Sequence, residues 1–212
     1  MKARLKVGVL ALQGAVEPHA RHLERIGASV VRVRKPEHLE GLAGIILPGG
    51  ESTTMIHLLH LNRLWEPLRQ FVHTKPAWGV CAGAILLARK VTHPEQEALG
   101  AVDIDVARNA YGRQTESFCT ALTPTAAWES QPIEGVFIRA PRITRVGQGV
   151  RVLMTHQNEP VMVAEGSRLV STFHPELTES LTVHHYFLTQ CENEDTSWIA
   201  ASPDTSAPLS IN

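Results

Sequence analysis

The sequence of 212 residues has little that would tie it to a membrane or to nucleic acid. No apolar run approaches the roughly 20 residues that span a bilayer, and the apolar stretch at residues 7–12 is too short for a secretory signal. The 20 Lys and Arg residues are balanced by 21 Asp and Glu residues, so there is no global positive field to attract phosphates. We therefore expect a cytoplasmic protein that binds neither nucleic acid nor membrane.

Cysteine is also scarce. The three cysteines, Cys81, Cys119 and Cys191, are odd in number and widely spaced, which favours reduced thiols over a disulfide framework. The histidine pairs at residues 57 and 60 and at 184–185 lack the spacing and cysteine partners of common metal sites. We expect no bound metal and no cofactor.

Strands and helices alternate through residue 90. Apolar runs rich in β-branched residues predict buried strands at residues 6–12, 29–33, 44–47 and 77–80. Helical spacing predicts helices at residues 17–26, 52–71 with a break near Asn62, and 82–89. This alternation is typical of an α/β fold with a mostly parallel central sheet flanked by helices.

Beyond residue 103 the pattern changes to short strand candidates. These are residues 103–107, 117–122, 136–139, 150–154, 160–164 and 169–173. They predict either an extension of the sheet or a short antiparallel β extension, followed by a helix at residues 179–191. Length and pattern predict one domain over residues 1–191, and the aperiodic residues 192–212 predict a mobile C-terminal tail.

Cys81 occupies the central position of Gly-Val-Cys-Ala-Gly, between a predicted strand and a predicted helix. This is the pattern of a nucleophile elbow with Cys in place of Ser. The sharp turn brings backbone close to the nucleophile, so Gly79 and Gly83 must lack a β-carbon. The N–H groups at the start of the helix favour a thiolate. A buried cysteine in a tight packing joint is the alternative, which the two glycines disfavour.

His174 and Glu176 follow the strand predicted at residues 169–173, at an edge where parallel sheets bind ligands. In an extended segment, residues two apart point the same way, so Glu176 can orient the imidazole of His174. Taken alone, His-Pro-Glu is typical of a turn with a solvated acid. Together with the cysteine elbow it predicts a Cys81, His174 and Glu176 triad.

The third element is the segment Pro-Gly-Gly-Glu-Ser at residues 48–52, again between a predicted strand and a predicted helix. The flexible Gly49-Gly50 backbone can aim an N–H at a developing oxyanion, and the N–H of Ala82 would be the second donor. An ordinary loop with Ser52 as the helix N-cap is the alternative, and both interpretations can hold together.

Six sequence blocks, in the same order along the chain, resemble the glutaminase subunits of pyridoxal 5′-phosphate synthase, a family of class I, triad-type glutamine amidotransferases. The blocks are Leu-Ala-Leu-Gln-Gly at 10–14, Leu-Pro-Gly-Gly-Glu-Ser-Thr at 47–53, Val-Cys-Ala-Gly at 80–83, Arg-Asn-Ala-Tyr-Gly-Arg-Gln at 108–114, Phe-Ile-Arg-Ala-Pro at 137–141 and Phe-His-Pro-Glu-Leu at 173–177. The resemblance implies a flavodoxin-like fold of the class I amidotransferase type.

The resemblance also implies roles for single residues. Cys81 would attack the side-chain amide of L-glutamine and form a γ-glutamyl thioester, with His174 moving protons and Glu176 holding the imidazole. Gly49, Gly50 and Ala82 would form the oxyanion hole. The residues implied to bind L-glutamine are Gly49, Gly50, Glu51, Arg108, Ile138 and Arg139. For Arg108 and Arg139 taken singly, a solvated surface charge is the more common fate.

The implied partner is a synthase subunit similar to a (β/α)₈ barrel, which receives the ammonia within a large hetero-oligomeric complex. In such complexes the glutaminase is poorly active until the partner orders its oxyanion region. Three alternatives remain at this point: a glutaminase of another ammonia-dependent pathway, another cysteine hydrolase such as a peptidase, and a non-catalytic binding subunit. The intact triad argues against the last, and Glu51 with the block at 108–114 argues against a peptidase.

Overall fold

The computed structural model describes residues 4–108, 117–126, 128 and 131–200, with side chains as far as Asn193. Its main sheet has seven strands in the order β10-β11-β12-β4-β3-β1-β2. Five of them are parallel: β1 (Lys6–Leu10), β2 (Ser29–Val33), β3 (Gly44–Leu47), β4 (Ala77–Val80) and β12 (Arg168–Ser171). The four strands predicted before residue 90 are therefore confirmed as neighbours in one parallel sheet.

Antiparallel strands extend one edge of this sheet. β11 (Glu159–Glu165) pairs antiparallel with β12, and β10 (Arg151–His156) pairs antiparallel with β11. The expectation of a mostly parallel sheet with an antiparallel extension is confirmed.

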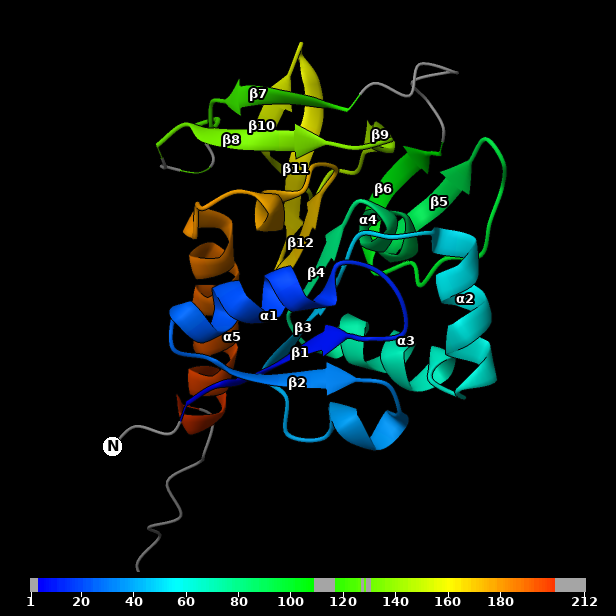
Figure 1. Ribbon diagram of the computed structural model, residues 1–212, viewed down its shortest axis with the longest axis vertical. Coiled ribbons are helices and arrows are strands. Elements are labelled where there is room, and N and C mark those ends of the chain that lie inside the picture. The colour runs from blue at the N-terminus through cyan, green and yellow to red at the C-terminus, as the bar shows by residue number, and fades with distance from the viewer. Residues whose placement is uncertain (1–3, 109–116, 127, 129–130, 201–212) are drawn as a thin grey trace, which may run out of the picture.

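Helices cover both faces of the sheet. On one face, Val7 and Val9 of β1 share a buried cluster with Leu23 of α1 (Val16–Arg25) and Phe187 of α5 (Thr182–Ala200). On the other face, Leu10 shares a second cluster with apolar residues of α2 (Ser52–Leu61), α3 (Trp65–Thr74) and α4 (Ala82–Leu87). Figure 1 shows α1 crossing in front of the parallel strands. Side chains alternate across a strand, so each parallel strand contributes to both clusters.

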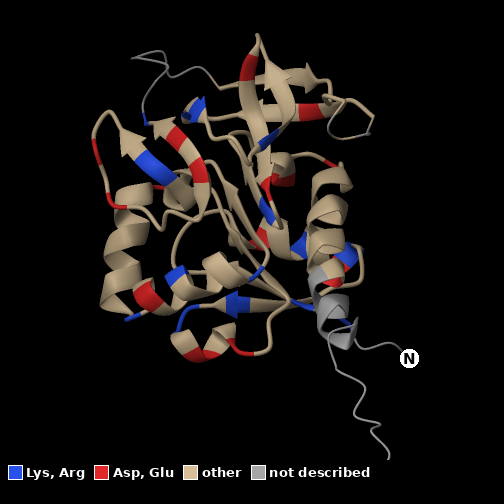
Figure 2. Ribbon diagram, turned by 180° about the vertical axis from the view of Figure 1, so that it is seen from behind, with Lys and Arg blue, Asp and Glu red and all other residues tan. Residues whose placement is uncertain are grey.

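Two smaller sheets lie at one end of the molecule, at the top of Figure 1. One contains β5 (Ala88–Thr92), β6 (Val102–Ala107) and β9 (Arg142–Val146), and the other pairs β7 (Phe118–Leu122) with β8 (Ile133–Phe137). Basic and acidic residues lie on neighbouring strands of the first sheet (Figure 2). Arg145 of β9 pairs there with Asp103 and Asp105 of β6. A short 3₁₀ turn, η1 (Pro36–Leu39), connects β2 to β3.

Several expected boundaries are wrong. The helix expected at residues 82–89 ends at Leu87, and residues 88–92 form β5 instead. The strand expected at 136–139 is β8, which ends at Phe137, and β9 was not expected at all. The break near Asn62 is confirmed, because Asn62 ends α2.

The final helix differs from expectation in its length. α5 continues past residue 191 to Ala200, and the remainder of the expected tail, residues 201–212, lies outside the described residues. None of the helices in the described part of the chain is long and apolar enough to cross a bilayer.

Candidate active site

Cys81 lies at the sharp turn between β4 and α4, in the strained backbone conformation expected of a nucleophile elbow. Its φ is 48°, an unusual value for a residue with a side chain, and its N–H donates to the carbonyl of Ser171 at 2.9 Å. A β-carbon on Gly79 would lie 2.4 Å from the carbonyl oxygen of Gly83, and one on Gly83 would lie 2.0 Å from that of Leu47. The predicted steric need for both glycines is therefore confirmed.

His174 and Glu176 follow β12 and meet beside Cys81. Nδ1 of His174 lies 2.8 Å from Oε1 of Glu176, and the backbone N–H of His174 donates to the carbonyl of Val136 at 2.8 Å. The segment is not extended as expected, because η2 (Pro175–Leu177) is a 3₁₀ turn. That turn brings the Glu176 side chain, which is fully buried, onto the imidazole.

The electrostatics of this pair favour an imidazolium beside a carboxylate. Burial lowers the pKa of His174, but the neighbouring Cys81 side chain and the Glu176 carboxylate outweigh it and raise the pKa to about 10. Burial raises the pKa of Glu176, but His19 and the hydrogen bond from His174 lower it below its usual value. At neutral pH, His174 therefore carries a proton that it can donate.

Gly49 and Gly50 follow β3 and form the wall opposite the triad. A β-carbon on Gly49 would lie 2.4 Å from Cε1 of His174 and 3.5 Å from the β-carbon of Cys81. The Gly49 carbonyl accepts a hydrogen bond from the N–H of Ala15 at 3.1 Å. The Gly49 carbonyl and the Gly50 N–H belong to the same trans peptide group, in which C=O and N–H point in opposite directions. The N–H of Gly50 therefore points away from Ala15.

Ala82 opens α4, so its N–H is among the first four of the helix, which have no partner within the helix. The three residues expected to form the oxyanion hole, Gly49, Gly50 and Ala82, all line one pocket.

Glu51, not Ser52, is the N-cap of α2. Its carboxylate accepts hydrogen bonds from the N–H groups of Thr53 at 3.1 Å and Thr54 at 2.6 Å, whereas the Ser52 hydroxyl donates to Gln96. Burial raises the pKa of Glu51, but the bonds from Thr53 and Thr54 lower it to about 2.

Arg108 lies at the end of β6 and faces the same pocket. Its Nη2 is 3.6 Å from Oε1 of Glu51, which leaves a cation and an anion side by side at the pocket wall. The rest of the block at 108–114 lies outside the described residues. Ile138 and Arg139 follow β8, and the Ile138 carbonyl lies 3.9 Å from Sγ of Cys81.

All the residues predicted for the site line one pocket of about 480 Å³. They are Gly49, Gly50, Glu51, Cys81, Ala82, Arg108, Ile138, Arg139, His174 and Glu176. Sequence reasoning missed the role of Gln13, whose Oε1 accepts a hydrogen bond from the N–H of Glu51 at 2.9 Å. The sequence signal for Gln13 is its place directly after a predicted buried strand, at the carboxyl ends of the parallel strands, where ligands bind.

Comparison with known proteins adds to this geometry. A model of the SNO glutamine amidotransferase family matches residues 9–193. The pyridoxal 5'-phosphate synthase subunit PdxT of Solibacter usitatus is 51% identical over 189 residues, which cover 87% of this chain and 98% of the relative. PdxT of Deinococcus radiodurans is 52% identical over 190 residues, covering 87% and 96%. A crystal structure of a glutamine amidotransferase is similar with a TM-score of 0.81 and 46% identity, covering 88% of this chain and 98% of that one.

Proposed function

Because the chain belongs to the SNO glutamine amidotransferase family, we propose that it hydrolyses L-glutamine and supplies the ammonia to a synthase subunit that makes pyridoxal 5′-phosphate. The observation that carries this proposal is the convergence of Cys81, His174 and Glu176 in one pocket. The match to relatives named PdxT over nearly their whole length supports the pathway.

The first half-reaction forms a thioester. The Cys81 thiolate attacks the side-chain amide carbon of glutamine, and the carbonyl oxygen becomes an oxyanion that the N–H groups of Gly50 and Ala82 stabilise. One such donor is worth about 3 kcal/mol of barrier. His174 then gives its proton to the leaving nitrogen, the C–N bond breaks, and ammonia departs.

The second half-reaction consumes water. His174 has already given its second proton to the leaving nitrogen, and the acylated Cys81 is no longer a thiolate that raises the pKa of His174, so the imidazole stays neutral more readily. Neutral His174 accepts a proton from water, the resulting hydroxide attacks the thioester carbon, and the C–S bond breaks. Glutamate leaves and the Cys81 thiolate is regenerated. Glu176 holds the imidazole throughout.

The pocket wall offers a recognition site for one free amino acid. The Arg108 guanidinium is a cationic partner for the α-carboxylate of glutamine, and the Glu51 carboxylate is an anionic partner for its α-ammonium group. Gly49, Ile138 and Arg139 complete the wall. A peptidase must instead admit a chain on both sides of the reacting bond.

A partner surface next to the pocket fits delivery of ammonia to another subunit. Ile138 and Leu177 line the pocket and are unusually exposed for large apolar residues, at 38% and 47%. We propose that the synthase subunit, of (β/α)₈ barrel form and part of a large hetero-oligomeric complex, covers this rim. The cytoplasmic location expected from the sequence fits such a complex and stays a prediction.

The test is reconstitution with the synthase subunit. Cys81→Ala should abolish pyridoxal 5′-phosphate synthesis from glutamine but leave synthesis from added ammonium salts intact, whereas the exposed Cys119→Ala should leave both intact. Loss of both activities in an assembled Cys81→Ala complex would contradict this division of labour. If the synthase subunit does not stimulate glutamate release by the wild-type chain, a glutaminase of another ammonia-dependent pathway is favoured.

We further propose that the catalytic domain needs nothing beyond α5. The family model ends at residue 193, and the last described buried side chain of α5 is Cys191. A chain that ends at Ala200 should keep full glutaminase activity in the complex. Reduced activity at equal assembly would assign a function to residues 201–212.

A further inference from the structure

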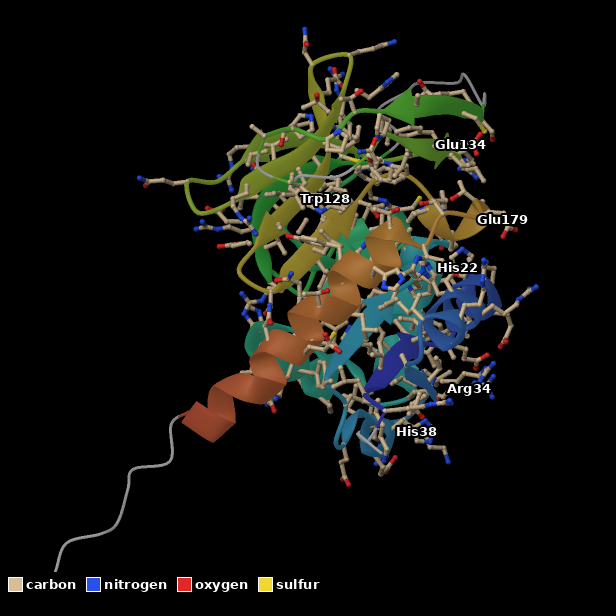
Figure 3. The ribbon with its side chains drawn as sticks, turned by 90° about the vertical axis from the view of Figure 1, so that its left-hand side faces the viewer. His22, Arg34, His38, Trp128, Glu134 and Glu179 are labelled. Carbon is tan, nitrogen blue, oxygen red and sulfur yellow. The ribbon has the colours of Figure 1, made fainter. Side chains whose placement is uncertain are left out.

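A cluster of three histidines lies behind the triad. His19 and His22 belong to α1 and His184 to α5, and all three side chains are buried outside the lining of the glutamine pocket. Figure 3 shows His22 between these two helices. Histidine is seldom fully buried, so a cluster of this kind needs a physical reason.

Two unpaired atoms connect this cluster to the triad. Nε2 of His19 and Oε2 of Glu176 are both buried, and neither has a hydrogen-bond partner in the described part of the chain. The two atoms face each other at 3.5 Å. Leaving a buried polar atom unpaired is unfavourable because the atom has lost its hydrogen bonds to water, and a small approach of the two side chains would pair both atoms at once. Catalytic hydrogen bonds are often long in a free enzyme and shorten when substrate binds.

The position of each proton follows from the partners. An ionised Glu176 can only accept, so a contact with it requires the proton of His19 to be on Nε2. Nδ1 of His19 is then an acceptor for the Nε2–H of His184, which lies 3.0 Å away. In this assignment the Nε2–H of His19 faces Glu176 and the Nε2–H of His184 faces His19, so each of the two buried N–H groups has an acceptor. Nδ1 of His184 carries no proton and is itself an acceptor.

The surroundings keep His19 neutral and fix its ring. Burial lowers the pKa of His19 to about 4, against the opposing effect of Glu176 and with the help of His174 and His22. Burial, His19, His22 and His185 lower the pKa of His184. The rings of His19 and Trp78 pack in a T-shaped arrangement, with ring centroids 5.4 Å apart.

We propose that neutral His19 is a positioning residue of the triad, which donates its Nε2–H to Oε2 of Glu176 in the catalytic state. Oε1 of Glu176 then stays free for His174, and the carboxylate is held between two imidazoles. Without this donor, the buried carboxyl group rotates or takes up a proton more easily, and His174 loses its orientation. The inference rests on the proposed glutaminase function, because it concerns that triad.

The decisive variants replace His19 by two amide side chains of different length, Gln and Asn. The amide nitrogen of Gln can occupy the place of Nε2 of a histidine, whereas the shorter Asn reaches only the place of Nδ1. In the complex, His19→Asn should lower kcat about tenfold or more, leave KM for glutamine unchanged and move the acid limb of the kcat profile to higher pH, because Glu176 protonates more easily. His19→Gln should keep kcat within about threefold of wild type and keep the acid limb in place, since it restores the donor.

His22→Gln is the matched control, since His22 lies on the same helix and in the same cluster but bonds to the carbonyls of Pro18 and Thr178. It should leave the acid limb unchanged. If His19→Asn and His19→Gln behave alike, or if the acid limb stays fixed in both, His19 only fills space and the proposal is overturned.

A measurement on the wild-type chain is independent of how the variants fold. Nitrogen-15 NMR should show His19 with its proton on Nε2, and without a second proton between pH 6 and pH 8. A proton on Nδ1 would overturn the proposal. Absence of glutaminase activity in the wild-type complex would instead contradict the proposed function, while the NMR result would still report on the contact between His19 and Glu176.

Discussion

Gly49 faces the imidazole of His174 so closely that a β-carbon on Gly49 would lie 2.4 Å from Cε1 and 3.0 Å from Nδ1 of the ring. No ordinary side-chain contact is that short, so any substituent at this position must displace His174 or the loop. The glycine is therefore needed for the geometry of Cys81, His174 and Glu176.

Gly49→Ala should lower the kcat of glutamine hydrolysis about 100-fold or more, since displacing a catalytic group by about 1 Å can cost that much. Gly149→Ala is the matched control, because a β-carbon there meets only Oε1 of Glu165 at 3.7 Å. Steady-state assays of both variants in the complex, with melting temperatures measured alongside, test this. Wild-type kcat in Gly49→Ala would show that the loop does not lie against His174 during catalysis.

The parallel core could be predicted because its signals are local. β1, β3 and β4 are short, almost entirely buried apolar runs, and burial on both faces removes the polar alternation that could be mistaken for another pattern. The boundary between α4 and β5 was missed because all six residues of α4 are buried, so the helix has no polar face to mark its end. β9 was missed because its partners, Asp103 and Asp105, lie far away in sequence and supply the charges that make a polar strand stable.

The site could be predicted for a related reason. Cys81 and His174 each follow a parallel strand, and the carboxyl ends of parallel strands meet at one edge of the sheet. Contacts between elements could not be read in this way. The approach of His19 to Glu176 joins α1 to a turn more than 150 positions later, and no local pattern marks either residue as a partner of the other.

Arg108→Gln should raise KM for glutamine about 10-fold to 100-fold and change kcat much less. Removing a charge-assisted hydrogen bond costs about 1.5–3 kcal/mol, and each 1.4 kcal/mol is a factor of ten in affinity. In the proposed function the guanidinium binds the α-carboxylate, a part of glutamine that does not change during the reaction, so its loss should weaken the binding of substrate and transition state equally.

Arg89→Gln is the control for this variant, because Arg89 is an exposed arginine that pairs with Asp103 on the surface. Initial rates over a range of glutamine concentrations separate the two parameters. A fall in kcat with KM unchanged would place Arg108 in the chemistry rather than in substrate binding.

The buried histidines make stability depend on pH in a defined window. The pKa of His19 is about 4 in the folded chain because burial disfavours the imidazolium, whereas an unfolded chain has an ordinary histidine near 6.5. The unfolded state therefore binds more protons between these values, and the free energy of unfolding falls as pH drops from about 6.5 to about 4. A difference of about 2.5 units corresponds to about 3 kcal/mol. His184, whose pKa is also lowered by burial, adds to the same slope.

The pKa shifts of His174 and Glu176 change the stability outside this pH window. The raised pKa of His174 contributes stability in full below about 6.5, and that contribution is lost only as pH rises toward about 10. The lowered pKa of Glu176 contributes stability that is lost only below the ordinary range of a carboxyl group.

Denaturant unfolding of the isolated chain at several pH values between 7 and 4 should therefore give a free energy of unfolding that falls with pH, and His19→Asn should make this slope shallower. His57→Asn, which changes an exposed histidine, should leave the slope as it is. An equal slope in wild type and His19→Asn would mean that His19 takes up its proton without cost, and so is not held neutral by burial.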